Sequence, residues 1–290
     1  MRVLLAGGSG MIGRALRRRL TARGHAVRAL VRRPAAGPDE HAWDATVGSV
    51  PPGALAWSDA VVSLNGAPLA RLPWTKAYRR QIMDSRVDAT AALAAAILDS
   101  DSPPRVWASG SATGIHGEGF LAAVTRAWEA AALPAAAATR LVRLRTGMVL
   151  APGEGALRPL TLATKAGLGM RIGGGDQFWP WISLRDEARA IIFTLEDESL
   201  AGPADLVGPT LATAEQITRA LAQALRRPHI LAAPAALLRA ALGAAAEEML
   251  LASQPIRPQA LQAHGFEFRD QTAAAAVAAA HLSGQAEHGA

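Results

Sequence analysis

The sequence predicts an α/β fold, in which a doubly wound parallel sheet is followed by a smaller, mainly helical C-terminal lobe. Short apolar strands alternate with amphipathic helices up to Leu150, as in a parallel sheet with helices on both faces. Beyond Leu150 the chain mixes glycine-rich loops with helical stretches. Its 290 residues also exceed what one small core needs. We therefore expect a first domain over residues 1–150, with 181–207 returning to it, and a smaller lobe over 151–180 and 208–290.

A β-α-β unit opens the chain. Residues 3–6 and 26–31 are short apolar strands, and residues 11–23 between them have the pattern of a helix. Ile12, Leu16 and Leu20 share one face of this helix, and a glycine ends it. Such a unit, complete within about 30 residues, is the first half of a nucleotide-binding sheet.

The later elements continue the alternation. We expect irregular structure over residues 33–58, and then the strand "DAVVSLNG", a helix over 74–98, the strand "RVWASGS", a helix over 118–133 and a single sixth strand "RLVRLRTGMVL". In the second part, "WIS" leads into a helix, and "ADLVG" forms a late strand. Residues 213–252 give helices with the connecting segments "RRPHI" and "LAAP" between them, "ALQAHGFEFRD" resembles a hairpin, and a final helix follows.

A glycine loop follows the first strand directly. Gly7, Gly10 and Gly13 form G-x-x-G-x-x-G at the start of the first helix. The turn needs a glycine with positive φ, a pyrophosphate needs close approach of the backbone, and the helix N-terminus supplies N–H donors. Because a strand and a helix flank the pattern, it favours a Rossmann-type dinucleotide site. A plain βα turn with incidental glycines is the alternative.

The end of the second strand indicates which dinucleotide is bound. Proteins that bind NAD place an acidic residue there to hold the ribose 2′-hydroxyl, whereas this chain reads "ALVRRP". No acid is near in the sequence, and Arg32 and Arg33 are suited to a 2′-phosphate. The cofactor expected is therefore NADP(H), although solvated surface arginines would look the same. Asn65 and Gly66 end the next strand, where they either line the cofactor or form a simple asparagine turn.

Composition excludes several other classes of protein. The chain has no cysteine, so disulfides and thiolate sites are excluded, and its histidines and acids show no metal-ligand spacing. The net charge is +6, but the basic residues are almost all arginines spread along the chain, so no nucleic-acid partner is expected. No signal peptide or membrane span is apparent, and we expect a cytoplasmic protein.

These stretches together resemble the extended short-chain dehydrogenase/reductase superfamily, in its atypical "epimerase family" branch with a C-terminal domain. Some members of that branch are labelled cell-division inhibitors. The segments that carry the resemblance include "GGSGMIGRAL", "ASGSATGIHG", "FLAAVTRAWEAAA", "RLRTGMVLAPGEGAL" and "GGGDQFWPWISLRDEARAI". The resemblance implies a dinucleotide domain and NADP(H), but no particular reaction or substrate.

The resemblance also assigns residues. Met11 and Ile12 join the three glycines in the phosphate loop, Arg32 matches the basic residue after the second strand, and Asn65 and Gly66 match an N-x-G turn region. Ser111 matches the strand-end serine of catalytic relatives. Two departures stand out: His116 replaces an aromatic residue, and the loop after Gly117 is much shorter than in relatives.

The usual proton donor of this superfamily is missing. Catalytic members carry Tyr-x-x-x-Lys on the helix after the serine, whereas this helix has neither residue, and the chain's one tyrosine is Tyr78. Ser111 and His116 remain as candidate catalytic residues, with a strand-end cap and a partly exposed loop histidine as their alternatives. We expect Glu129 to be a solvated or interhelical charge, and Arg86 to have a core or surface role, with a position facing the site from the long helix as the alternative.

Two hypotheses follow from the sequence, and it leaves open whether the protein is an enzyme. One is an NADP(H)-dependent oxidoreductase or epimerase that acts on an unknown small molecule with an atypical proton donor. The other is a non-catalytic NADP(H)-binding sensor or scaffold that acts through a protein partner.

Overall fold

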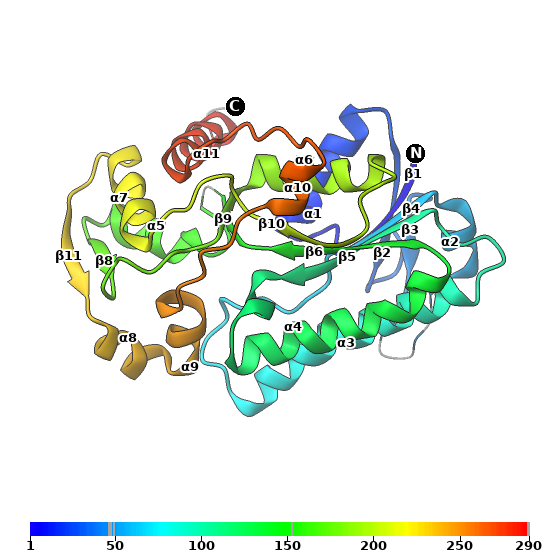
Figure 1. Cartoon of the computed structure of the whole chain (residues 1–290), viewed down its shortest axis with the longest axis horizontal. Coiled ribbons are helices and arrows are strands. Elements are labelled where there is room, and N and C mark those ends of the chain that lie inside the picture. The colour runs from blue at the N-terminus through cyan, green and yellow to red at the C-terminus, as the bar shows by residue number, and fades with distance from the viewer. Residues whose placement is uncertain (46–47, 49, 152, 289–290) are drawn as a thin grey trace.

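A seven-stranded parallel sheet forms the centre of the molecule (Figure 1). The computed structural model describes residues 1–45, 48, 50–151 and 153–288. The strand order is β10-β6-β5-β4-β1-β2-β3, and every pair is parallel. The strands are β1 (Arg2–Ala6), β2 (Ala26–Val31), β3 (Glu40–Ala42), β4 (Ala60–Ser63), β5 (Val106–Ala112), β6 (Arg140–Thr146) and β10 (Gly202–Leu206). This is the doubly wound Rossmann-type sheet that the sequence predicts.

Helices cover both faces of the sheet. On one face α1 packs against α6, and on the other α3 packs against α4, with α2 beside α3 (Figure 1). Their bounds are α1 (Met11–Ala22), α2 (Pro52–Trp57), α3 (Lys76–Leu98), α4 (Gly119–Ala132) and α6 (Leu184–Glu196). Each face has its own apolar core: Leu5, Leu16 and Ile191 lie in one, and Leu4, Leu93 and Trp107 in the other. The alternate strand residues Leu4 and Leu5 therefore point to opposite faces, which explains why β1 is apolar from Val3 to Ala6.

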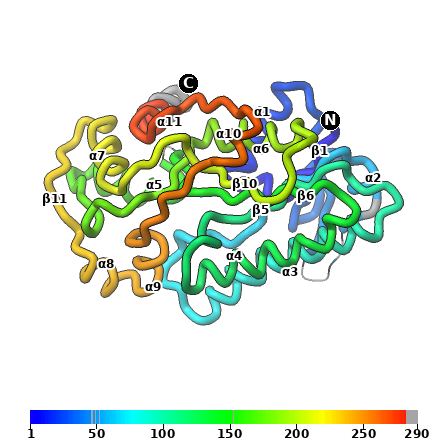
Figure 2. The backbone as a smooth tube through the Cα atoms, in the orientation of Figure 1, coloured from blue at the N-terminus to red at the C-terminus, as the bar shows by residue number. Residues whose placement is uncertain are grey.

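A second lobe lies at one end of the sheet, beyond β6 and β10 (Figures 1 and 2). It holds a two-stranded parallel sheet with helices around it, and a third small sheet pairs β7 with β9. The remaining elements of the chain are β7 (Met148–Leu150), α5 (Leu157–Lys165), β8 (Gly169–Ile172), β9 (Trp181–Ser183), α7 (Ala214–Ala224), β11 (His229–Ala233), α8 (Ala235–Leu242), α9 (Ala244–Ala246), a π-helical turn (Glu247–Leu251), α10 (Gln259–Ala263), which packs on β10, and α11 (Ala273–His288).

Four local expectations are wrong. Residues 33–58 contain β3 and α2 rather than only irregular structure. The predicted sixth strand is two strands, because the chain leaves the main sheet at Gly147, where a Cβ would collide with the carbonyl oxygen of Pro180. "RRPHI" and "LAAP" contribute to a strand, β11, and "ALQAHGFEFRD" begins with α10 instead of a hairpin.

The strand order reverses between β1 and β4. The chain runs outward from β1 to β2 and β3, and then crosses back to β4 on the other side of β1. In sheets of this kind a crevice opens at such a reversal, outside the carboxyl ends of the strands, and ligands bind there. The glycine loop follows β1 and Asn65 follows β4, so both lie at this point.

Candidate functional site

The glycine loop has a geometry that no other residue type would tolerate at two positions. Gly7 has a φ of 81°, and a Cβ there would lie 2.7 Å from the carbonyl carbon of Leu64. A Cβ on Gly13 would lie 2.7 Å from the Cα of Gly8 and would strike the Gly7 carbonyl oxygen. These contacts hold the loop tightly against β4 and bring the start of α1 close to the end of β1.

The N-terminus of α1 offers free hydrogen-bond donors. Gly10 is the N-cap residue, so no side chain caps the helix, and its first turn holds no acidic residue. Met11 and Ile12 occupy that turn and are partly buried against the core. The N–H groups of an uncapped first turn, together with the helix dipole, attract an anion.

The two arginines after β2 differ in their partners. Arg32 is exposed, and in the part of the chain that the structure describes it forms no ion pair. Arg33 donates to both carboxylate oxygens of Glu40, at 2.6 and 2.7 Å. Glu40 comes close because β3 pairs with β2, which sets Glu40 opposite Ala29. We expected no acid near this strand end, and the structure places one there through a strand that the sequence pattern did not reveal.

Arg86 is an unneutralised cation beside the glycine loop. The loop touches Leu64 and Asn65, and a Cβ on the next residue, Gly66, would lie 2.7 Å from the guanidinium carbon of Arg86. Arg86 donates only to the main-chain carbonyls of Ile82 and Ala67, and no ion pair joins it to a described carboxylate. Burial without a counter-charge lowers the pKa of Arg86 to about 10.

A buried acceptor lies next to this cation. The Oδ1 atom of Asn65 has no hydrogen-bond partner among the described residues, which is uncommon for a buried side-chain oxygen. The guanidinium of Arg86 lies against Gly66, the residue after Asn65, so the side chains of Arg86 and Asn65 are both candidates for holding a ligand at the reversal point of the sheet.

Ser111 belongs to a buried charged cluster at the ends of β5 and β6. Its hydroxyl donates to Oε1 of Glu129 on α4, at 2.7 Å. Glu129 also accepts from Arg143 at 2.8 Å and from Arg145 at 2.7 and 3.0 Å. Arg143 and Arg145 are alternate residues of β6, so both side chains leave the same face of the sheet. Our expectation of a solvated or interhelical Glu129 is wrong: its side chain is 5% exposed.

The hydrogen bonds of the cluster determine the ionisation of Glu129 and the direction in which the Ser111 hydroxyl donates. Burial acts to raise the pKa of Glu129, but hydrogen bonds from Arg145 and Ser111 outweigh it, and the pKa is lowered. Glu129 is therefore ionised, and the hydroxyl proton of Ser111 is committed to it. The lone pairs of Ser111 remain free to accept a hydrogen bond.

His116 ends a short 3₁₀ turn (Thr113–His116) that follows β5. Its Nε2 lies 3.0 Å from Oδ1 of Asp205 on β10. In the register of the sheet Asp205 lies opposite Arg145, so the pair adjoins the Glu129 cluster. With Nε2 bound to Asp205, Nδ1 is the ring nitrogen left for another partner.

Helix α4 contains neither tyrosine nor lysine. Thr125 donates its hydroxyl to the carbonyl of Leu121, one turn earlier. The main-chain N–H groups of Phe120 and Leu121 donate to Glu248 of the second lobe, at 3.1 and 2.6 Å. Tyr78 is buried on α3, and its hydroxyl donates to the Pro68 carbonyl. Neither tyrosine nor lysine therefore reaches the end of β5 from this helix.

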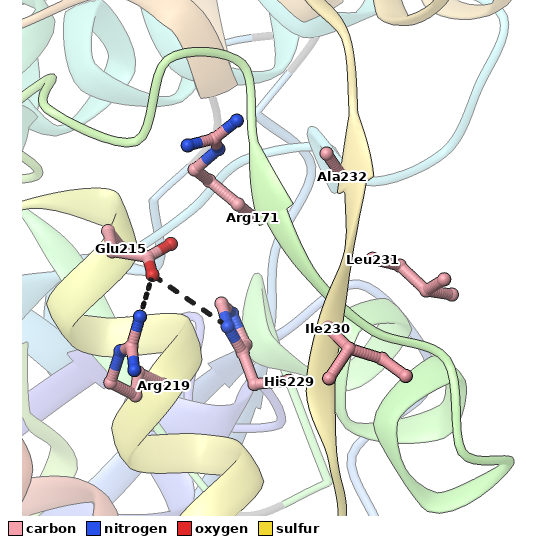
Figure 3. Close-up of a pocket in the computed structure, with 7 residues that line it drawn as sticks. All are labelled: Arg171, Glu215, Arg219, His229, Ile230, Leu231 and Ala232. Atoms are coloured by element: carbon pink, nitrogen blue, oxygen red, sulfur yellow. Dashed lines mark hydrogen bonds and ion pairs between the residues drawn. The ribbon is translucent and has the colours of Figure 1, made fainter.

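A cavity of about 260 Å³ lies elsewhere, in the second lobe between β8, β11 and α7. Figure 3 shows Glu215 and Arg219 of α7 pointing toward His229 of β11, while Ile230 and Leu231 point away from them. Glu215 pairs with Arg219 at 2.6 Å and lies 3.8 Å from His229. No residue that lines this cavity comes from a strand end of the main sheet, so it is separate from the candidate site.

The described residues contain neither a cluster of side chains suited to a metal ion nor a helix long and apolar enough to cross a membrane.

Two family models match the chain. Residues 3–119 match the NAD dependent epimerase/dehydratase family, and residues 233–280 match a domain of unknown function, DUF1731. The first covers β1 to the start of α4, with the glycine loop, Asn65, Ser111 and His116. The second covers the end of β11 to α11, and it includes Glu248.

Known proteins resemble the chain over nearly its whole length. An epimerase family protein of Mycobacterium leprae is 39% identical over 285 residues, which is 93% of this chain and 92% of that protein. The crystal structure of human epimerase family protein SDR39U1 with NADPH has a TM-score of 0.89 and 31% identity, and the match covers 97% of this chain and 99% of that chain. A nucleoside-diphosphate sugar epimerase from Corynebacterium glutamicum has a TM-score of 0.67 and 26% identity, over 100% of this chain and 67% of that chain. The chain therefore belongs to the NAD dependent epimerase/dehydratase family, as the resemblance of its motifs implied.

Proposed function

We propose that this protein binds NADP(H) at the carboxyl edge of its main sheet and exchanges hydride with a small carbonyl or alcohol substrate. The observation that carries the first half is the uncapped N-terminus of α1, together with two arginines, Arg32 and Arg86, that have no carboxylate partner among the described residues. The human relative whose structure contains NADPH supports the choice of dinucleotide.

In this proposal, different residues of the chain hold different parts of the cofactor. Gly7, Gly10 and Gly13, with the N–H groups of Met11 and Ile12, hold the pyrophosphate, and Arg32 holds the 2′-phosphate. Asn65, Gly66 and Arg86 hold the middle of the dinucleotide. The nicotinamide, when bound, supplies or accepts the hydride. We assign the dinucleotide to the domain of residues 1–150 and 181–207, and the substrate to the lobe of 151–180 and 208–290.

His116 moves the proton in this proposal. The chain lacks the usual Tyr-x-x-x-Lys pair, and Ser111 donates its own proton to Glu129. His116 retains Nδ1 after Nε2 binds Asp205, and an imidazole nitrogen can donate a proton to a substrate or accept one from it. Ser111 contributes by accepting a hydrogen bond from the substrate.

A titration tests cofactor binding. NADPH should quench the tryptophan fluorescence of the wild-type protein and bind more tightly than NADH. Gly13→Ala should abolish binding, because a Cβ there displaces the loop. Gly53→Ala is the matched control, since no atom lies within 4 Å of a Cβ at that position. A wild-type protein that binds neither dinucleotide contradicts the proposal.

Hydride exchange tests the chemistry. NADPH deuterated at C4 should lose its label to a member of a panel of aldehydes, ketones and nucleotide sugars, and His116→Gln should slow that reaction by about 10²-fold or more. NADPH affinity should stay within twofold in this variant. An unchanged rate in His116→Gln would remove the histidine from the mechanism.

The Ser111–Glu129 hydrogen bond favours a second candidate, a non-catalytic NADP(H) sensor, because it ties up the usual substrate-binding serine. In that case the panel shows no turnover, while NADPH and NADP⁺ give different sedimentation or different binding of a protein partner. Identical behaviour with both forms would argue against the sensor.

A further inference from the structure

We propose that Glu40 determines how strongly the protein selects NADP(H) over NAD(H), by withholding Arg33 from the 2′-phosphate. This inference rests on the proposed binding of NADP(H) at the end of β2. Its basis is the difference between two adjacent arginines. Arg32 forms no ion pair with a described residue, whereas Arg33 donates to Glu40 through both Nη1 and Nη2 of its guanidinium group.

The contact between Arg33 and Glu40 is bidentate. Nη1 and Nη2 of Arg33 each donate to a different oxygen of Glu40, and Nη1 also donates to the Pro34 carbonyl at 3.0 Å. A phosphate needs the same two parallel donors, so carboxylate and phosphate compete for one fork. Arg33 cannot serve both at full strength.

Glu40 is itself held from two directions. The N–H group of Ala36 donates to it at 2.8 Å, and β3 fixes its main chain beside β2. Its side chain is 15% exposed, whereas that of Arg33 is 56% exposed. The carboxylate is thus the anchored partner, and Arg33 is the one that must move if a phosphate is to recruit it.

The charge of Glu40 adds to this competition. The hydrogen bond from Arg33, with that from Ala36, lowers the pKa of Glu40 to about 2, so the carboxylate is ionised at any working pH. Arg17 of α1 is a further cation whose field reaches Glu40. A 2′-phosphate held by Arg32, the residue before Arg33, is repelled by the ionised carboxylate of Glu40. NAD(H), with a neutral 2′-hydroxyl, does not meet this repulsion.

The experiment is a set of binding titrations with NADPH, NADH, 2′,5′-ADP and AMP. The variants are Glu40→Gln, Arg33→Ala, Arg32→Ala and the double variant Glu40→Gln/Arg33→Ala. Glu40→Gln should raise the affinity for NADPH and 2′,5′-ADP by about tenfold, and leave NADH and AMP within twofold. Arg32→Ala should remove the preference for NADPH.

The double variant separates the two effects of Glu40→Gln, which are the release of Arg33 and the removal of the negative charge on Glu40. Arg33→Ala alone should change NADPH affinity little, but combined with Glu40→Gln it should cancel most of the gain, because the released fork is then gone. Glu247→Gln is the matched control, since Glu247 forms the same kind of exposed pair with Arg239 in the second lobe. Thermal melting of each variant checks that it is folded.

Each outcome is decisive. An unchanged NADPH affinity in Glu40→Gln overturns the inference while leaving cofactor binding in place. A loss in Arg33→Ala as large as that in Arg32→Ala also overturns it, because Arg33 would then already serve the phosphate. A wild-type protein that binds no dinucleotide overturns the proposed function and this inference together.

Discussion

The two halves of the sheet's carboxyl edge differ in how their polar groups are satisfied. At the glycine loop the α1 N-terminus is uncapped, Arg32 and Arg86 have no carboxylate partner among the described residues, and Asn65 Oδ1 has no hydrogen bond. At the ends of β5, β6 and β10, Glu129 binds Ser111 and two arginines, and His116 binds Asp205.

This difference indicates what each half is built to do. Unsatisfied donors and acceptors carry a cost in the free protein that a ligand removes on binding, so the glycine-loop half is suited to a large polar ligand. In the other half, Ser111 and Glu129 bind each other and His116 binds Asp205, so these side chains are paired without a ligand. We therefore expect substitutions there to affect folding, and substitutions at the glycine loop to affect affinity.

The largest effect is expected for Glu129→Ala. It leaves Arg143 and Arg145 largely buried without a counter-charge, which typically costs about 3–5 kcal/mol of unfolding free energy. Urea denaturation followed by circular dichroism measures it. Glu247→Ala, in an exposed pair, should cost far less. Similar losses in the two variants would show that the Glu129 cluster is not a stabilising unit.

Glu187 should make stability depend on pH. It is fully buried on α6, it accepts a hydrogen bond from Thr146 at the end of β6, and burial raises its pKa to about 8 from 4.5. Because the folded-state pKa is the higher one, its stabilising contribution is complete below pH 4.5 and is lost as the pH rises toward 8.

In that interval the loss is about 1.4 kcal/mol per pH unit. The advantage of Glu187→Gln over the wild type, measured by urea denaturation at pH 5, 6 and 7, should therefore grow with pH at this slope. Parallel pH profiles would mean that Glu187 is ionised in the folded protein. The half of the edge at β5, β6 and β10 would then contain a further charge.

Arg86→Met should weaken NADPH binding by about tenfold, since a charge-assisted hydrogen bond to an anion is lost. Its unfolding free energy should not fall by more than about 1 kcal/mol, because no described carboxylate pairs with Arg86 and none would be left unpaired. Arg80→Met, on the exposed side of the same helix, is the control. Unchanged affinity in Arg86→Met would place the cation outside the binding site and weaken the contrast between the halves.

The smallest effect is a gain in unfolding free energy at a residue outside both halves, and it gives a reference size for the larger effects. Arg226 follows α7 with a φ of 52°, and it is the one residue other than glycine with positive φ in the described chain. Arg226→Gly should raise the unfolding free energy by about 0.5–1 kcal/mol, because glycine adopts this conformation without strain. Arg227→Gly should give no such gain in the same denaturation assay.

The sequence by itself determined the parts of this protein that depend on neighbours along the chain. Most of the expected strands and helices are present, and the glycine loop lies between β1 and α1, as its spacing indicates. These features are local: the close approach at Gly13 is made to Gly7 and Gly8 of the same loop, and helical or strand periodicity requires no knowledge of distant residues. Family membership follows from the same local motifs.

Only the tertiary structure decided which polar groups are free. The state of Arg33 depends on Glu40, which β3 brings alongside, that of Ser111 on Glu129, 18 positions away, and that of His116 on Asp205, 89 positions away. Such partners are chosen by strand register and by which helix face meets the sheet. Both are set by packing across the whole core, so the pattern of residues predicts where the site lies but not which of its side chains remain available to a ligand.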